Sequence, residues 1–509
     1  MAAAKKIRDF FCSEQETRAG TLVSVTLGVL SKPVGYLRTL LLAWLFGASA
    51  GMDGLYVAMG ILSLVCQVVQ NVAESAVLPR LVKLKGSEAE SLMARVSRCV
   101  FFTAAGLAAL VCLFPSSVVR VFARRLDAGR LKLAANMLVL LFPWALAWIL
   151  QSLLGVWNNY RGRYSLNIFL SVTGYTLLIP AVWAASYFIG VYSVAVMYSV
   201  MLCITVGMTW HVSGDFPVKS AHVPAEQIRS LWKDCLLCVG IVGAASLNQL
   251  VDRYFASGLA VGSITAIYYA GLIYTLPQSI LAPAMMIYLN RASRAAGDRT
   301  ASLGKLEPAL CMSWLYIFPP AVFLVFFAAP TVRVFLGYGA FDANAVAMTA
   351  PCMAAAAWAL PLMLWGQFLA RYAQALGRLK TILAVSYGAL AANVILDWML
   401  APVLGAPGLC AATGIALGVS ALVYAHILAP GTVVRVFRAV LFPSAAFTAA
   451  AAGISLLNGR PLIALSAAAG ALAVYYLAGE RLGFFEAVPA DWRPLNLLKL
   501  AFSRLLRLR

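Results

Sequence analysis

The stretch SKPVGYLRTLLLAWLFGASAGMDGLYVA, residues 31–58, decides the fold class because it is long and apolar and yet carries charges. Similar apolar runs recur along the 509-residue chain, which is 62% hydrophobic and only 11% charged. A run of about 20 apolar residues lets a helix cross a bilayer core. A membrane β-barrel would instead show short alternating segments. We therefore predict an all-α integral membrane protein.

About fourteen transmembrane helices can be drawn from the apolar runs. They lie near residues 20–46, 54–82, 97–118, 133–156, 165–187, 190–210, 230–256, 263–289, 309–335, 344–370, 379–401, 406–427, 433–456 and 461–479. The connecting loops are short, and none is long enough to hold a soluble domain. The chain is therefore expected to be one helical bundle.

An internal repeat divides this bundle. LYVA at 55–58 resembles IYYA at 267–270, and VRVF at 119–122 recurs at 332–335. The spacing covers six spans, an even number, so both copies have the same orientation, as in two-lobed transporters. We expect two pseudo-symmetric six-helix lobes followed by two more helices and an amphipathic cytoplasmic tail. The boundaries are 1–211, 212–428, 429–480 and 481–509.

The net charge of +20, from 39 Lys and Arg against 19 Asp and Glu, reflects the membrane rather than nucleic acid. The basic residues lie mostly in loops that follow even-numbered spans, as expected for cytoplasmic loops. Both termini are therefore predicted to be cytoplasmic. One loop departs from this bias: residues 119–132, VRVFARRLDAGRLK, put a basic cluster on the opposite side.

The first span carries two cations, Lys32 and Arg38, with Pro33 and Gly35 between them favouring a kink or local unwinding. Charges inside a membrane are costly and usually face a wet cavity or a partner. Arg38 is the stronger candidate for an anion site, because a guanidinium binds a diffuse, bidentate anion better than an ammonium does. Snorkelling to the membrane surface is the alternative for both.

Further candidate substrate-binding residues follow in the second and seventh spans. A polar face of the second span is expected to point into the bundle, because such a stripe is unfavourable against lipid; it comprises Gln67, Gln70, Asn71 and Glu74. Asp53 lies at the outer mouth, where an N-cap is the alternative role. Arg253 adjoins Asp252, and a local ion pair is the alternative for both. This arrangement indicates a transporter for an amphipathic anion with a phosphate or other acidic headgroup.

A cation site is predicted in the second lobe. Asn393 and Asp397 are spaced i,i+4 and share a helical face, while Asp252 and Thr413 are expected at similar depth. Ligation by oxygen alone suits a hard cation such as Na⁺. The alternative is that Arg253 neutralises Asp252 and the other side chains only join neighbouring helices. No other cofactor is expected.

Four stretches in order resemble the MurJ/MviN family of the MOP exporter superfamily. They are LRTLLLAWLFGASAGMDGLYVA, NQLVDRYFASGLAVGSITAIYYAGLIYTLP, VFLGYGAFDANAVAMTA and LGAPGLCAATGIALGVSALVYAHIL. The resemblance implies fourteen spans in the bacterial cytoplasmic membrane and alternating-access flipping of an undecaprenyl-pyrophosphate-linked sugar. For peptidoglycan and cell wall biogenesis this substrate is lipid II. It also implies a sodium site with one backbone carbonyl, for which Leu409 is the candidate.

This chain departs from the family pattern at several cationic positions. Thr39 follows Arg38 where members usually have Asp, Leu272 stands near a common Arg, and VCQVVQN replaces an Arg pair. Two alternatives therefore stay open: a flippase for another lipid-linked oligosaccharide, of O-antigen or exopolysaccharide type, and a non-transporting membrane relative. A membrane glycosyltransferase is disfavoured by the short outer loops, so the chain is not expected to be an enzyme.

Overall fold

The computed structural model describes residues 17–84, 86–218, 224–279, 281, 299–456, 461–486, 488 and 493–496. Contacts divide the chain into two compact units. The first unit holds the described residues up to Thr265 together with Tyr338–Asp342, and the second holds Ala266–Gly337 and the described residues from Ala343 onward. The chain passes from the first unit to the second within α12 (Ser263–Tyr274).

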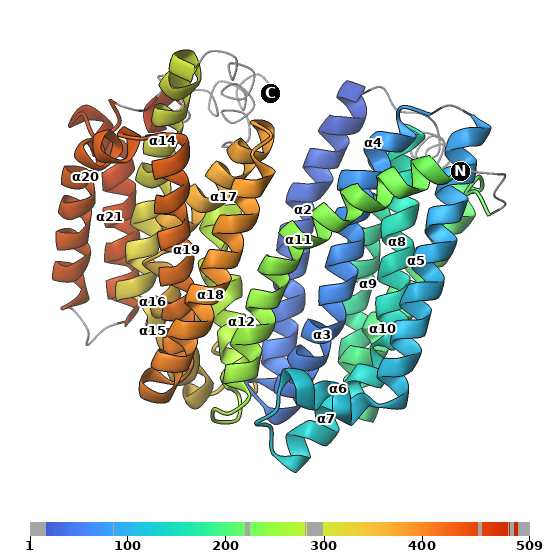
Figure 1. The fold of residues 1–509 in the computed structure, drawn as a ribbon. Helices are drawn as coiled ribbons and strands as arrows, with labels where there is room; N and C mark the ends of the chain where they lie inside the picture. Colours follow the sequence, from blue (N-terminus) through green and yellow to red (C-terminus); the bar gives the residue numbers. More distant parts are fainter. Residues whose placement is uncertain are drawn as a thin grey trace, which may run out of the picture. The chain divides into compact units, whose positions relative to one another are not determined.

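The other helices of the first unit are coloured from blue to green in Figure 1. In chain order they are α2 (Thr17–Phe46), α3 (Ala50–Val72), the π-helix η1 (Ala73–Val77), α4 (Leu78–Leu81), α5 (Ser87–Leu113), α6 (Pro115–Phe122), α7 (Ala128–Leu140), α8 (Phe142–Tyr160), α9 (Leu166–Ile189), α10 (Tyr192–Ser213) and α11 (Ala225–Ala256).

The helices of the second unit follow from yellow to red in the same figure. They are α14 (Arg299–Phe326), α15 (Ala328–Leu336), α16 (Ala343–Ala357), α17 (Leu360–Ala375), α18 (Leu379–Leu404), α19 (Ala406–Leu428), α20 (Thr432–Ser455) and α21 (Pro461–Arg481). The tail helix expected over 481–509 lies mostly outside the described residues.

The all-α membrane fold is confirmed. Ten helices among the described residues are long and apolar enough to cross a membrane, or up to twelve spans if each of two bent helix pairs counts as one. No strand occurs in the described part of the chain. The expected total of fourteen spans is not confirmed by this count.

Proline divides several runs that hydropathy presents as single spans. The run predicted at 133–156 consists of α7 and α8, bent by 42° with Pro143 in the first turn of α8. The run at 344–370 consists of α16 and α17, bent by 54° with Pro361 in the first turn of α17. Because proline has no N–H to donate, a new helix starts readily at it.

The repeat is visible in the order of the helices. The two VRVF copies lie in corresponding short helices, α6 and α15. Each short helix follows a long one, α5 or α14, and precedes a bent pair. LYVA lies in α3 and IYYA lies in α12.

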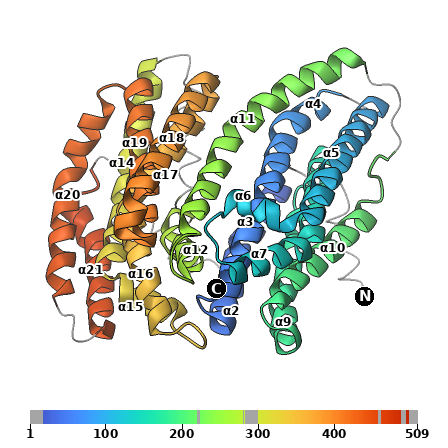
Figure 2. The same cartoon turned by 60° about the horizontal axis from the view of Figure 1, so that its bottom comes forward.

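Helix α11 begins the second copy of the repeat but packs with the first unit. It contacts α3, and the two helices lie side by side in Figures 1 and 2. The predicted boundary at residue 211 therefore marks the sequence repeat, whereas the packing boundary falls within α12.

The core of the second unit is aromatic and satisfies its own polar groups. Trp365 is fully buried and its indole N–H donates to the Ser313 hydroxyl at 3.0 Å. The indole N–H of Trp314 donates to the Ser444 hydroxyl, also at 3.0 Å. These bonds join α14 to α17 and α20, so buried tryptophans are tolerated here without unpaired N–H groups.

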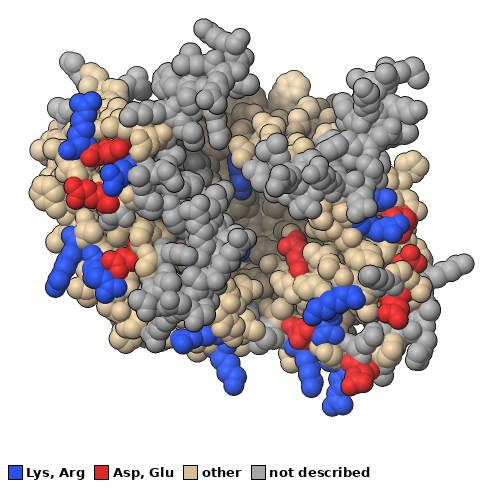
Figure 3. Space-filling view, turned by 90° about the horizontal axis from the view of Figure 1, so that it is seen from above, with Lys and Arg blue, Asp and Glu red and all other residues tan. Residues whose placement is uncertain are grey.

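Charged side chains gather at the ends of the helices. Figure 3 views the molecule from the top of Figure 1 and shows Lys and Arg side chains interspersed with Asp and Glu side chains over this face. Several pairs are ion pairs within one unit, such as Arg161 and Arg163 with Asp215, and Arg435 with Glu307. This distribution suits helix ends that lie in water or among lipid headgroups.

Candidate functional site

Arg38 is held by two tyrosines of the first unit. Its guanidinium carbon lies 5.2 Å from the ring centre of Tyr175 on α9 and 5.5 Å from that of Tyr198 on α10. Both distances are within the range of a cation–π interaction, which strengthens as water is excluded. Tyr198 is only 6% exposed, so one wall of this aromatic pair is rigidly packed.

The rest of the first span is more regular than the sequence indicated. Helix α2 is continuous from Thr17 to Phe46 through Pro33, so the expectation of local unwinding is wrong. Lys32 is exposed, unlike half-buried Arg38. Thr39, at the position where the family pattern has Asp, is 1% exposed and its hydroxyl donates to the Gly35 carbonyl at 3.1 Å. The buried Thr39 hydroxyl therefore has its hydrogen-bond partner within its own helix.

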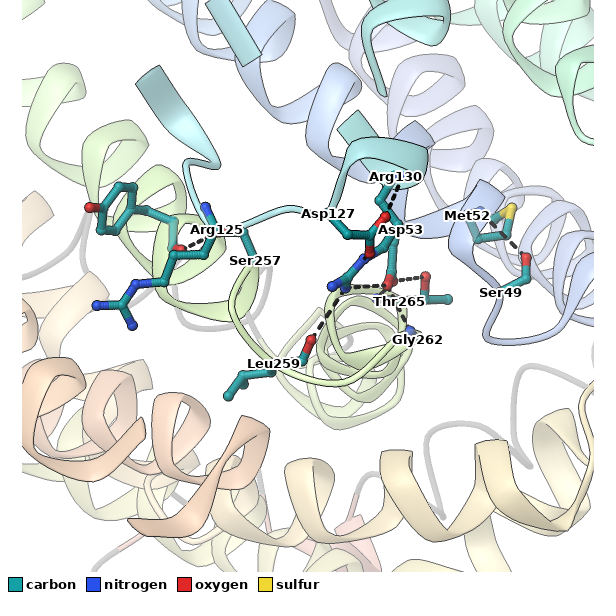
Figure 4. A network of polar contacts seen from close by, with 11 residues as sticks. Ser49, Met52, Asp53, Arg125, Asp127, Arg130, Ser257, Leu259, Gly262 and Thr265 are labelled. Atoms are coloured by element: carbon teal, nitrogen blue, oxygen red, sulfur yellow. Dashed lines mark hydrogen bonds and ion pairs between the residues drawn. The ribbon is translucent and has the colours of Figure 1, made fainter. Parts of the chain in front are cut away.

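Asp53 accepts hydrogen bonds from the chain around the start of α12 (Figure 4). It is 0% exposed, and its carboxylate accepts from the Gly262 N–H at 2.7 Å, from the Thr265 N–H at 2.9 Å and from the Thr265 hydroxyl at 2.7 Å. Ser49, not Asp53, is the N-cap of α3, accepting from the Met52 N–H at 3.4 Å. The alternative of a cap on its own span is therefore wrong: Asp53 binds the start of another helix.

Gly262 is required where it stands. Its φ of +89° is a conformation that L side chains rarely adopt, and a Cβ would lie 2.6 Å from the carbonyl oxygen of Ala48. The turn presents the Gly262 N–H directly to Asp53. A side chain at this position would displace one of the three donors.

Arg130 is the buried cationic member of the basic loop that departs from the charge pattern. Its side chain is 10% exposed; its Nε donates to Asp127 at 2.6 Å and one Nη donates to the Leu259 carbonyl at 3.2 Å. The same Nη lies 4.0 Å from Asp53. Arg130 is thus a buried structural cation of the first unit rather than a loop charge, as Figure 4 shows.

Two local features place Arg130. Gly54 on α3 lets α7 approach closely, because a Cβ there would lie 3.1 Å from the Ala134 nitrogen. Asp127 caps α7 by accepting from the Arg130 N–H at 2.8 Å. This bond, followed by the one from the Arg130 side chain, holds the pKa of the Asp127 carboxyl below its ordinary value.

The polar face of the second span is largely hydrogen-bonded. Gln70 donates to Glu74 at 3.1 Å and accepts from the indole N–H of Trp148 on α8 at 2.9 Å. Asn71 donates to the Gln67 carbonyl at 2.8 Å. Glu74 is exposed and begins the acidic turn of η1. Gln67, Gln70 and Asn71 are half-buried, so the end of this face near Glu74 is its most exposed part. π-helical turns often occur at functional sites.

Asp252 and Arg253 lie near the end of α11, within the first unit. The Arg253 guanidinium lies against Gly60 of α3, where a Cβ would collide with it. Glycine at position 60 therefore leaves room on the surface of α3 for the Arg253 side chain of α11. The other predicted cation ligands belong to the second unit.

In the second unit, Asn393 and Asp397 of α18 are both 0% exposed, and the Asn393 amide donates to the Asp397 carboxylate at 3.1 Å. The predicted shared helical face is confirmed by this contact. Leu409 is buried and Thr413 half-buried on α19, which packs along α18. No cluster of three His, Cys, Asp or Glu side chains suited to a metal occurs in the described residues. A cation here would need amide, hydroxyl and carbonyl oxygens beside one carboxylate.

Sequence reasoning missed the partners of its own candidates. Tyr175, Tyr198, Thr265 and Trp148 are aromatic or hydroxyl residues in apolar runs, and such residues are ordinary in membrane helices. Among these partners, only Arg130 could have been suspected from the sequence, because it lies in the one loop that opposed the charge bias.

Repeated helical units with bent helix pairs and polar groups inside the spans define a multi-span membrane protein of the transporter class. The family model described as lipid II flippase MurJ matches residues 42–477. The chain therefore belongs to the MurJ family.

Individual relatives agree with this assignment. A lipid II flippase MurJ of Burkholderia cenocepacia is 26% identical over 413 residues, which cover 76% of this chain and 79% of that protein. The fold matches a structure titled lipid II flippase MurJ, inward closed conformation, with a TM-score of 0.79 and 20% identity over 91% of this chain and 99% of that one. An inward-facing multidrug resistance MATE family transporter of the MOP superfamily matches with a TM-score of 0.63 and 15% identity, covering 82% and 98% of the two chains.

Proposed function

We propose that this chain flips lipid II, a pyrophosphate-linked lipid carrier of the peptidoglycan precursor, across the bacterial cytoplasmic membrane by alternating access. The observation that carries the proposal is the family match over residues 42–477. We also propose that both termini lie on the cytoplasmic side, because the loops after even-numbered spans carry most of the basic residues.

Arg38 is the residue we assign to the substrate pyrophosphate. The rings of Tyr175 and Tyr198 orient the guanidinium through its π-faces. Its N–H donors point outward in the plane, where they suit two phosphate oxygens at once. The ring contacts therefore favour anion binding rather than compete with it.

The carboxylate of Asp53 is assigned to a gate in the first unit. It fixes two backbone amides around the start of α12, which is the helix that leads into the second unit. Release of these amides frees the connection, and their recapture restrains it. Glu74 is exposed and accepts a hydrogen bond from Gln70, and we assign it to the substrate cavity of the first unit.

A sodium ion is the coupling ion we propose, bound at Asn393 and Asp397 with the Thr413 hydroxyl and the Leu409 carbonyl. The donor set fits Na⁺: all the groups offer oxygen, and the one carboxylate is fully buried, where a counter-charge is favourable. The contribution of Asp252, in the first unit, stays a prediction.

The test is rescue of a strain depleted of its essential lipid II flippase. The full chain is expected to restore growth, Arg38→Lys to restore it weakly, and Arg38→Gln not at all, each at equal protein level in the membrane. Tyr175→Phe keeps the π-face and should rescue, whereas Tyr175→Leu should not. Full rescue by Arg38→Gln would remove this arginine from the mechanism.

Failure of the unmodified chain to rescue would reject lipid II as its substrate. In that case binding of undecaprenyl pyrophosphate to the purified chain separates the remaining candidates. Retained binding favours a flippase for another lipid-linked oligosaccharide, for which the departures at Thr39 and Leu272 are the motivating observation. Loss of binding favours a non-transporting relative.

A further inference from the structure

A narrow apolar cleft of about 200 Å³ lies within the first unit, between α3 with η1, α5 and α11. Valines supply much of its wall: Val72 on α3, Val96 and Val100 on α5, and Val239 on α11. Apolar cavities of this size exclude water and accept apolar ligands. In a membrane, the surrounding medium itself provides such ligands.

The cleft is elongated along the helices. Its lining runs from Leu92 to Val100 on α5 and from Ile228 to Val239 on α11. At a rise of 1.5 Å per residue these segments span about 12 Å and about 16 Å. A cleft of this length and volume admits part of one unbranched alkyl chain.

The two ends of the cleft differ in polarity. Arg95 is the one charged residue in its lining and lies on the third turn of α5, and Trp232, 62% exposed, lies on the corresponding early part of α11. Arginine and tryptophan near helix ends are typical of the membrane interface. The lining residues that follow on α5 are Val96, Cys99 and Val100, which carry no charge, and Arg98 lies outside the lining. Along α5 the lining therefore changes from a cation, Arg95, to apolar side chains, just as a lipid changes from a charged headgroup to an apolar tail.

Arg95 is available to an anion. Asp234, the carboxylate on α11 in this region, is bound by Arg80. No ion pair joins Arg95 to a carboxylate in the part of the chain that the structure describes. The cation at the mouth of the cleft thus complements a phosphate.

We propose that this cleft binds one acyl chain of an anionic glycerophospholipid from the surrounding bilayer, with the lipid phosphate on Arg95. Basic pockets between transmembrane helices bind anionic headgroups in this manner. A polyprenyl chain is longer and carries a methyl branch on every repeat unit, so a cleft of about 200 Å³ holds a smaller fraction of it. Since Ala73 and Val77 of η1 also line the cleft, the bound chain covers the π-helical turn and joins α11 to α3 and α5.

The experiment uses the purified full chain in detergent with dioleoyl phosphatidylglycerol or dioleoyl phosphatidylcholine as the added lipid. Native mass spectrometry counts retained lipids, and thermal unfolding measures their effect on stability. Val239→Trp fills the cleft from its 39% exposed side. Leu236→Trp is its control, on the same helix, 74% exposed and outside the lining. Arg95→Gln removes the cation, and Arg98→Gln is the control for loss of one exposed arginine from α5.

We expect the unmodified chain and both control variants to retain one phosphatidylglycerol and to unfold at a higher temperature with it. Val239→Trp should lose both effects. Arg95→Gln should lower the preference for phosphatidylglycerol over phosphatidylcholine by about tenfold, the size of one charge-assisted hydrogen bond. In the unmodified chain, a phosphatidylglycerol with a photoreactive group in its acyl chain should cross-link to the cleft lining, and this result does not depend on any variant folding.

Three results overturn the proposal. The first is equal retention of phosphatidylglycerol by Val239→Trp and Leu236→Trp. The second is a cross-link map that avoids α5 and α11. The third is displacement of the cross-link by undecaprenyl phosphate but not by unlabelled phosphatidylglycerol, which assigns the cleft to the tail of a polyprenyl substrate instead.

Discussion

Thr265→Val tests the hydrogen bonds that Asp53 accepts around the start of α12. Valine has the shape of threonine but lacks the hydroxyl that donates to Asp53 at 2.7 Å. A hydrogen bond to a charged group contributes about 1.5–3 kcal/mol to stability. The Thr265 N–H keeps its own bond at 2.9 Å, so only one bond is lost. Thr265→Ser keeps the hydroxyl and serves as the matched control.

Asp53→Asn should cost more, about 3–5 kcal/mol, because it breaks a fully buried charged network. One carboxylate oxygen faces the Gly262 N–H and the other faces both donors of Thr265. Whichever way an asparagine amide turns, its NH₂ group meets another donor. The measurement is thermal unfolding of the full chain in detergent, followed by tryptophan fluorescence.

The expected order of unfolding midpoints is wild type, then Thr265→Ser, Thr265→Val and Asp53→Asn, with Thr265→Val lower than wild type by about 2 °C. Two outcomes contradict the reasoning. One is equal loss in the serine and valine variants, which would assign the effect to packing. The other is an Asp53→Asn variant as stable as wild type, which would show that the carboxylate charge contributes nothing.

Three further outcomes are expected. Trp148→Phe removes the 2.9 Å bond to Gln70 and should destabilise the chain by about 1 kcal/mol in denaturant unfolding; an unchanged midpoint would show that the bond adds nothing. Asp127→Asn keeps a capping group but removes the charge next to Arg130. Because the folded-state pKa of Asp127 is lowered, the extra stability of wild type over the variant should be full above about pH 4 and shrink as the pH falls below it. A stability difference that does not shrink on acidification would contradict this. Sodium should raise the unfolding midpoint of wild type above that in equal potassium but not that of Asp397→Asn, and an identical sodium effect in both would exclude this carboxylate as a ligand.

The fold class and the repeat could be predicted from the sequence because they depend on local, additive signals. Hydropathy over about 20 residues identifies a span wherever its neighbours lie. The VRVF copies identified corresponding helices because their surroundings recur in order. The i,i+4 spacing of Asn393 and Asp397 likewise fixed one contact, because helix geometry alone brings such a pair together.

The remaining features depend on which helix faces which, and a single sequence does not record that. Arg38 was recognisable as a costly charge, but nothing local points from it to tyrosines 137 and 160 residues away. The bend between α7 and α8 was hidden because proline in an apolar run lowers hydropathy little. Asp53 was assigned to the outer mouth by its position, yet its role follows from amides that lie 209 and 212 residues later.

That separation has a consequence for how the chain is made. A ribosome completes α3 long before it reaches residue 262, so during synthesis the Asp53 carboxylate exists without the three donors that it finally binds. Arg130, delivered with α7, is the one member of the network available in the interval. The first unit is therefore finished only when the opening of the second repeat has been translated. A polypeptide released at residue 211 would lack the Gly262 and Thr265 donors of Asp53, so the first unit depends on residues that belong to the second copy of the repeat.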